Sequence, residues 1–90
     1  MDRISLLRFF LRTADTGSFT VASQQLGVSL ASVSRGIDAL EKELGTPLFV
    51  RTTRKVTLTT AGKALVKKAR EILLIYDGMQ SDARTIAGLS

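Results

Sequence analysis

The chain has 90 residues, 44% of them hydrophobic, with a formal net charge of +5 and neither cysteine nor histidine. This length allows one small domain, the lack of cysteine excludes disulfides and thiolate metal sites, and the lack of histidine removes the most common general base. No apolar run reaches the roughly 18–20 residues that cross a membrane, and charges interrupt the apolar amino terminus, unlike a signal peptide. We therefore expect a cytoplasmic protein with no membrane partner, cofactor or metal.

The first expected helix covers roughly residues 3–15. Its apolar residues keep helical spacing, and they are Ile4, Leu7, Phe10, Leu11 and Ala14. The arginines on its other side are Arg3, Arg8 and Arg12. Gly17 is expected to end this helix in a left-handed conformation, and Ser18 to cap the next one.

Residues 18–44 predict two helices joined by a tight turn, over about 19–26 and 30–44. Gly27 supplies the bend and Ser29 can cap the second of these helices. The apolar residues expected to pack inside are Val21, Ala22, Leu26, Val28, Val33, Ile37, Leu40 and Leu44. A short helix, a glycine turn and a longer amphipathic helix indicate a helix-turn-helix, whose second helix can enter the DNA major groove.

The apolar stripe leaves an outer side on the helix expected over 30–44. Its residues are Leu30, Ala31, Ser34, Arg35 and Asp38. Arg35 can bond a guanine with two donors, although an ion pair with Asp38 is the alternative. Hydroxyl groups that can bond phosphate or bases are those of Ser29, Ser32 and Ser34. For Ser29 a simple capping role is the alternative.

Gly36 lies inside this helix but off the apolar stripe, so we expect that core packing does not require it. Two interpretations stay open. Gly36 is either a neutral surface residue, or it lets the helix backbone approach a phosphate or a base edge. Glycine within a helix costs about 1 kcal/mol relative to alanine.

Residues 48–50 and 56–58 are short β-prone runs that predict a small hairpin, a wing, with its tip at 51–55. Residues 51–70 carry seven basic side chains and no acidic one, whereas residues 1–50 carry five of each. Such a block beside a helix-turn-helix favours a polyanionic partner over a merely solvated face. The cations expected to follow the DNA backbone or enter the minor groove are Arg51, Arg54 and Lys55.

A long helix is expected from Thr59 or Thr60 onward, with an apolar stripe kept over about 26 residues. The stripe consists of Ala61, Leu65, Ala69, Ile72, Tyr76, Met79, Ala83 and Ile86, widened by Leu73 and Ile75. One small domain cannot cover a stripe of this length, so we expect a homodimer through residues 60–88. The dimerising residues are expected to be Leu65, Ala69, Ile72, Leu73, Tyr76 and Met79. Alternatively, the helix folds back on its own core and its far half overhangs.

Enzymatic function is not expected. The chain has no histidine, no glycine-rich phosphate loop and no cluster of carboxylates suited to catalysis or metal binding.

In these elements the sequence resembles the amino-terminal DNA-binding domain of LysR-type transcriptional regulators. The matching positions are Leu7, Phe10, Gly17-Ser18-Phe19-Thr20, Ala22, Leu26, Val28-Ser29, Val33-Ser34-Arg35, Ile37, Leu40-Glu41, Leu44-Gly45, Leu48-Phe49, Arg51, Leu58-Thr59 and Ala61-Gly62. The resemblance implies a mostly α fold: a winged helix-turn-helix with a three-helix core over residues 1–59, and a dimerising linker helix over 60–90. It also implies a C-terminal effector-binding domain, which these 90 residues do not contain.

By this resemblance, the DNA-contacting positions are Ser29, Leu30, Ala31, Ser32, Ser34, Arg35, Arg51 and Arg54. The family usually has glutamine at the positions of Leu30 and Gly36, and proline or serine at that of Ala31. Leu30 can contact a thymine methyl group but cannot form an amide fork to adenine. We thus expect a homodimer that reads an interrupted palindrome in double-stranded DNA. The alternatives are a non-specific nucleoid-type binder, or a protein-interaction module that uses the stripe of the last helix.

Overall fold

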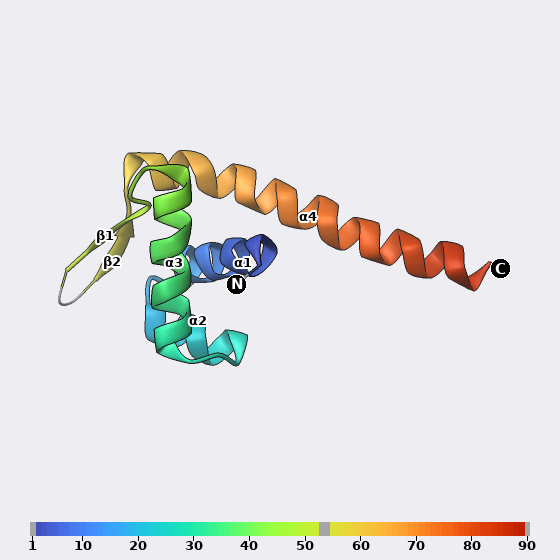
Figure 1. Cartoon of the computed structure of the whole chain (residues 1–90), viewed down its shortest axis with the longest axis horizontal. Helices are drawn as coiled ribbons and strands as arrows, with labels where there is room; N and C mark the ends of the chain where they lie inside the picture. Colours follow the sequence, from blue (N-terminus) through green and yellow to red (C-terminus); the bar gives the residue numbers. More distant parts are fainter. Residues whose placement is uncertain (1, 53–54, 90) are drawn as a thin grey trace.

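The elements follow the predicted order of three helices, a hairpin and a long helix (Figure 1). The computed structural model describes residues 2–52 and 55–89, with elements α1 (Arg3–Thr16), α2 (Phe19–Leu26), α3 (Leu30–Leu44), β1 (Phe49–Arg51), β2 (Val56–Leu58) and α4 (Thr60–Gly88). The bounds predicted for α2 and α3 are confirmed, and α1 ends one residue later than expected. The mostly helical, winged helix-turn-helix fold is therefore confirmed.

Side-chain caps and a left-handed glycine set the helix boundaries around the turn. Each N-cap side chain accepts a hydrogen bond from the backbone N–H three residues later, and these caps are Asp2, Ser18, Ser29 and Thr59. The bond satisfies one of the free N–H groups of the first turn. Thr59, not Thr60, is thus the cap of α4. Gly27 has φ of 69°, which L side chains rarely adopt, and it makes the bend between α2 and α3.

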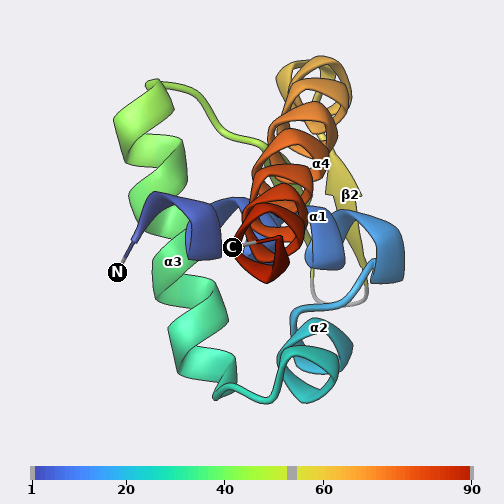
Figure 2. The same ribbon diagram turned by 90° about the vertical axis from the view of Figure 1, so that its right-hand side faces the viewer.

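The core lies around α1, which contacts α2, α3 and α4. Figure 2 looks along α4 and shows α1 running across α3. The largest fully buried side chains are Phe10, Ile37, Leu48, Val33 and Thr13. The hairpin is antiparallel, with Phe49 opposite Leu58 and Arg51 opposite Val56. Phe49 is buried, so the base of the hairpin joins the core while its other end projects.

Three apolar residues expected inside are exposed instead. Val21 is 39%, Val28 37% and Leu44 47% exposed, so the inward assignment is wrong for them. α2 is only eight residues long and buries just Ala22 and Ser23. Leu44 is the last residue of α3 and borders an open apolar groove between α1 and α4. In short helices and at helix ends, fewer residues of an apolar stripe are therefore buried than the spacing predicts.

Gly36 is buried, so its interpretation as a surface residue is wrong. It lies on the side of α3 that also carries Glu43, seven residues and about two turns later. Glu43 bonds Arg3, the first residue of α1, at 2.8 Å. Because its surface is covered by the protein, Gly36 is neither a neutral surface residue nor a point of approach for a phosphate.

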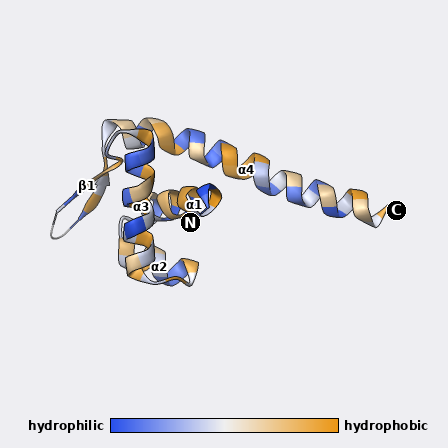
Figure 3. Ribbon diagram, in the orientation of Figure 1, coloured by the Kyte–Doolittle hydropathy of each residue, from blue (hydrophilic) through white to orange (hydrophobic). Residues whose placement is uncertain are grey.

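The two halves of α4 have different surroundings. Gly62, Ala69 and Leu73 are buried in the first half, and two of them belong to the core that α1 and α3 form. Leu73 is the last buried residue of α4 among the described residues, and Asp77 still bonds Arg8 of α1. Beyond Asp77 the helix projects from the globular part, and the molecule measures 54 × 26 × 20 Å. Figure 3 shows that hydrophobic residues continue along this projecting half. Met79, for example, is 58% exposed.

The expected dimerising residues separate into two groups along α4. Ala69 is 3% and Leu73 7% exposed, so assigning them to a partner surface is wrong, because their own chain already covers them. Leu65 is also packed against this core. Ile72 and Met79 remain 46% and 58% exposed. Within the single chain the alternative is therefore what the structure shows: the first half of α4 packs on its own core and the far half overhangs.

Two ion pairs hold α4 on α1. Arg8 bonds Asp77 at 2.7 Å, and Arg70 bonds Asp15 at 3.0 Å. The hydrogen bond from Arg8 lowers the pKa of the Asp77 carboxyl below its ordinary value. Both pairs are about half exposed, so each contributes little to stability by itself.

Candidate nucleic-acid interface

The outer side of the first turns of α3 is open to solvent. Leu30 is 48% exposed; Ala31 and Arg35 are exposed as well, and Ser34 is partly exposed. These residues share one face because the apolar stripe of α3 is turned toward α1 and α2. The outer face that the sequence predicts is therefore present as an accessible surface.

Ser29 forms a reciprocal pair with Ser32 at the start of α3. The Ser29 hydroxyl accepts a hydrogen bond from the Ser32 N–H at 3.0 Å and donates to the Ser32 hydroxyl at 2.8 Å. The capping role of Ser29 is thus confirmed. Ser29 remains exposed, and a hydroxyl has two lone pairs, so capping leaves room for a further hydrogen bond. A helix N-terminus of this kind favours an approaching anion.

Arg35 has an exposed side chain with no hydrogen-bond or ion-pair partner in residues 2–52 and 55–89. Asp38, its expected alternative partner, instead accepts a hydrogen bond from Arg51 at 2.9 Å. The pair between Arg35 and Asp38 is therefore not formed. The donors of the Arg35 guanidinium remain available to a ligand in front of α3.

Arg51 is turned toward α3 and does not project from the wing. Its Nη2 donates to Asp38 and also to the Oε1 of Glu41 at 3.0 Å, and its Cζ lies 5.0 Å from the centre of the Phe19 ring. The expectation of a free wing cation is corrected for this residue. Sequence reasoning missed these partners because they lie 13 and 10 residues away, with no periodicity to relate them.

The start of α2, the start of α3 and the hairpin border one open groove. Its volume is about 300 Å³. Its lining residues are Gly17, Ser18, Phe19, Thr20, Leu30, Thr52, Lys55 and Val56. Hydroxyl groups and one lysine thus lie beside the apolar Leu30, a combination that suits a sugar–phosphate strand. The sequence contained a partial signal, in that Ser18 and Thr20 flank the expected start of α2.

At the end of the hairpin, Thr52 and Lys55 are joined by hydrogen bonds. The Thr52 N–H donates to the Lys55 carbonyl at 3.0 Å. The Lys55 N–H donates to the Thr52 hydroxyl at 3.1 Å. Lys55 is exposed beside the groove. Arg54, also predicted to contact DNA, lies outside the described residues.

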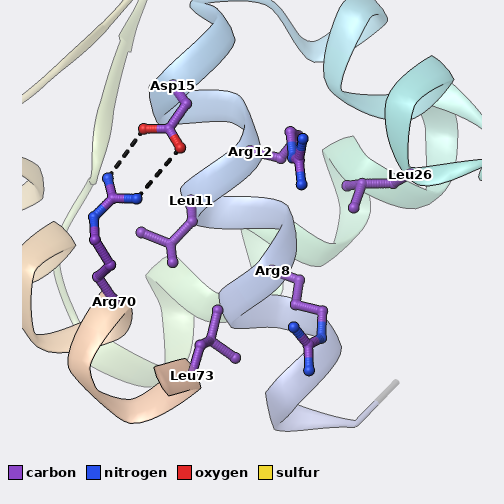
Figure 4. A pocket seen from close by; sticks show the side chains of 7 residues that line it. All are labelled: Arg8, Leu11, Arg12, Asp15, Leu26, Arg70 and Leu73. Atoms are coloured by element: carbon purple, nitrogen blue, oxygen red, sulfur yellow. Dashed lines mark hydrogen bonds and ion pairs between the residues drawn. The ribbon is translucent and has the colours of Figure 1, made fainter. Parts of the chain in front are cut away.

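Other arginines gather on a different side of the molecule. A cavity of about 160 Å³ is lined by Arg8, Leu11, Arg12, Asp15, Leu26, Arg70 and Leu73 (Figure 4). Arg70 belongs to the basic block of residues 51–70, yet it is paired with Asp15 here. The lining residues come from α1, α2 and α4 alone, so the basic block divides between two surfaces.

Within residues 2–52 and 55–89, no three His, Cys, Asp or Glu side chains come together to hold a metal ion. Among the helices of these same ranges, none combines the length and apolar character of a membrane span.

The sequence relatives are regulators of transcription. The family profile "Bacterial regulatory helix-turn-helix protein, lysR family" matches residues 4–63. The chain is 46% identical to the regulator BudR of Klebsiella aerogenes over 81 residues, covering 90% of this chain and 57% of BudR. It is 41% identical to the transcriptional activator AllS of Salmonella typhimurium, covering 89% of this chain and 26% of AllS. The chain thus spans about half or less of these curated relatives.

Solved structures share the whole fold. The CbnR DNA-binding domain in complex with DNA superposes with a TM-score of 0.88 at 33% identity, covering 97% of this chain and 99% of that one. The BenM DNA-binding domain bound to catB site 1 DNA gives a TM-score of 0.89 at 34% identity, covering 97% and 96%. Oxidised OxyR of Corynebacterium glutamicum gives 0.92 at 34% identity, covering 98% of this chain and 27% of OxyR. From the profile, the relatives and the fold together, this chain belongs to the LysR family of bacterial helix-turn-helix regulators.

Proposed function

We propose that this chain binds double-stranded DNA sequence-specifically, with α3 in the major groove and the hairpin along the backbone or in the minor groove. DNA binding and transcription regulation follow from family membership, and the proposal assigns them to particular elements. The observation that supports it best is Arg35, exposed and unpaired within the described residues, on the outer side of α3. Arginine there can make a two-donor contact with guanine.

The remaining DNA contacts are assigned by position. Residues proposed to approach the major groove with Arg35 are Ser29, Leu30, Ala31, Ser32 and Ser34. Leu30 can meet a thymine methyl group, and Ser29 can add a phosphate contact at the helix N-terminus. Lys55 and Arg54 are proposed to contact the backbone near the hairpin. The groove lined by Thr20 and Thr52 offers room for one strand beside them.

We further propose that two copies pair through α4. The projecting half carries an apolar face formed by Ile75, Gly78, Met79, Asp82, Ala83 and Ile86. Solvent-exposed apolar surface of this kind is typical of a protein contact. Ile72 and Tyr76 extend it toward the globular part. Two recognition helices related by a two-fold axis would read an interrupted palindrome.

The cellular setting follows from the same proposal. A bacterial regulator of this kind acts in the cytoplasm on nucleoid DNA. Response to a small-molecule effector would require the C-terminal domain that the family resemblance implies, which lies outside these 90 residues.

Selection from a random pool of duplexes, at near-physiological salt, tests the function directly. A two-fold symmetric consensus is expected among the bound sequences. Affinity should also fall steeply as salt rises, because each neutralised phosphate releases counterions. Retention without enrichment would point to a non-specific nucleoid binder. No retention even at low salt would refute DNA binding and favour the protein-interaction module.

The variant Arg35→Ala tests whether Arg35 contacts a base. We expect binding to the selected duplex to weaken by about 1–3 kcal/mol, with relaxed preference at one base pair of each half-site. Repeating the selection with the variant measures that preference. An equal loss on selected and random duplexes would mean that Arg35 contacts phosphate instead.

A further inference from the structure

The Arg51 side chain connects the hairpin to both helices of the helix-turn-helix. It belongs to β1, bonds Asp38 and Glu41 of α3, and lies over the ring of Phe19 at the start of α2. Only 35% of this side chain is exposed. One guanidinium thus touches the recognition helix, the preceding helix and the wing.

Glu41 fixes the other end of the same strand. Its Oε2 accepts hydrogen bonds from the backbone N–H groups of Leu48 at 2.6 Å and Phe49 at 3.3 Å, while its Oε1 accepts from Arg51. The carboxylate side chain is only 17% exposed. Both ends of β1 are therefore tied to one side chain of α3, which fixes the direction of the strand as well as its position.

Aromatic contacts between β1, α1 and α2 add to the contacts that hold the hairpin on the helices. The ring of Phe49 meets Phe10 of α1 edge-on, with centroids 5.7 Å apart, and meets Phe19 at 6.0 Å. Phe19 in turn faces Arg51. Edge-to-face aromatic pairs attract each other beyond the burial of their surface, and the cation over the ring is attracted by the ring's quadrupole.

The charges of this cluster do not suit a phosphate. Two carboxylates face one guanidinium, so the cluster of Asp38, Glu41 and Arg51 carries a net charge of −1. The Asp38 side chain is 61% exposed, on the outer side of α3 that also holds Arg35. A phosphate that approached Arg51 would meet this carboxylate and be repelled.

From these contacts we infer that Arg51 is a positioning residue for DNA recognition and not a phosphate contact. It holds the hairpin at a fixed angle to α3. The groove between hairpin and helix is thereby kept complementary to the surface of DNA. This inference rests on the proposed DNA-binding function.

The variant Arg51→Lys tests it at constant charge. Lysine is a good phosphate ligand but lacks the planar fork and the stacking surface of arginine. We expect affinity for the selected duplex to fall about tenfold, with a loss of preference for it over random DNA. The reason is that a DNA-binding surface whose hairpin is not fixed relative to α3 no longer matches one sequence precisely. The slope of log affinity against log salt should not change.

The matched control is Lys55→Gln, which removes a cation from the same hairpin. Its salt slope should fall by about 0.9, the effect of one lost phosphate contact, with equal losses on selected and random duplexes. Near wild-type binding by Arg51→Lys would overturn the inference, because lysine can replace arginine at a phosphate contact. A salt slope that Arg51→Gln lowers as much as Lys55→Gln does would overturn it as well, because that is the effect of losing a phosphate contact.

A second measurement needs no DNA. The chain has no cysteine, so two introduced cysteines can carry spin labels without background. Labels at the exposed residues Ala39 of α3 and Thr57 of β2 report the distance between helix and hairpin. We expect Arg51→Lys to broaden the distance distribution and Lys55→Gln to leave it unchanged. An unchanged distribution in Arg51→Lys would overturn the inference, whereas failure of the wild-type chain to bind any duplex would overturn the proposed function instead.

Discussion

The two halves of α4 have the same apolar periodicity but different neighbours. In the first half, Ala69 and Leu73 complete the core under α1 and α3. In the second half, Leu74, Ile75 and Met79 stay exposed. One continuous stripe therefore serves folding at one end and is available for association at the other. Helical spacing identifies such a stripe without showing which protein surface covers each part of it.

Leu73 and Leu74, where the two halves of α4 meet, provide the sharpest test of the difference between the halves. Leu73→Ala should destabilise the fold by about 2–5 kcal/mol, because it leaves a cavity in the core. Leu74→Ala removes the same atoms from an exposed site and should change stability by less than about 0.5 kcal/mol. Thermal unfolding of both variants measures the contrast. Equal destabilisation would mean that the core extends further along α4 than the burial of these residues indicates.

The start of α4 should be nearly as sensitive. A Cβ at position 62 would overlap the carbonyl oxygen of Leu48. Since backbone cannot move aside cheaply, Gly62→Ala should cost about 1–3 kcal/mol or more. Gly78→Ala is the matched control, because a Cβ there meets nothing within 4 Å. Urea unfolding should show a loss for the first variant and none for the second, and a neutral Gly62→Ala would contradict the close packing of α4 on the loop before β1.

The projecting half should respond through association and not through folding. Met79→Glu places a charge in the proposed contact and is expected to shift the chain toward monomers, with an unfolding midpoint that matches wild type at concentrations too low for the dimer to form. Sedimentation velocity over a concentration series measures this shift. Gln80→Glu adds the same charge to the neighbouring exposed position and serves as control. A dimer that persists in Met79→Glu would place the contact elsewhere.

The smallest effect is expected at the ion pair where the two halves meet. The folded state lowers the pKa of Asp77, so its contribution to stability is present above the ordinary carboxyl pKa, near 3.9, and is lost as pH falls through the lowered value. Asp77→Asn should therefore unfold at a lower temperature than wild type at pH 7, with the gap closing below about pH 4. Asp82→Asn, further along α4, is the control. A gap that persists at acid pH would rule out the carboxylate as its cause.

Local chemistry explains why so much of the fold could be predicted. Ser18, Ser29 and Gly27 act on residues within one turn of themselves, and the bounds of α2 and α3 were accordingly found from sequence. The outer position of Arg35 followed from helical spacing in the same way. What could not be predicted depends on distant contacts. The burial of Gly36 is one such case, and the inward turn of Arg51 is another.

Continuity gives α4 a mechanical consequence. The helix runs unbroken from Thr60 to Gly88, a length of about 43 Å at 1.5 Å per residue. It is seated on the globular part at one end only, so it behaves as a lever. The part beyond Asp77 is about 16 Å long, so a tilt of about 15° there would move the far end by about 4 Å, more than the rise between adjacent base pairs of DNA. In the proposed dimer, changes in the packed half of α4 that leave stability intact would thus alter the spacing between the two recognition helices, and with it the operator length that the pair can span.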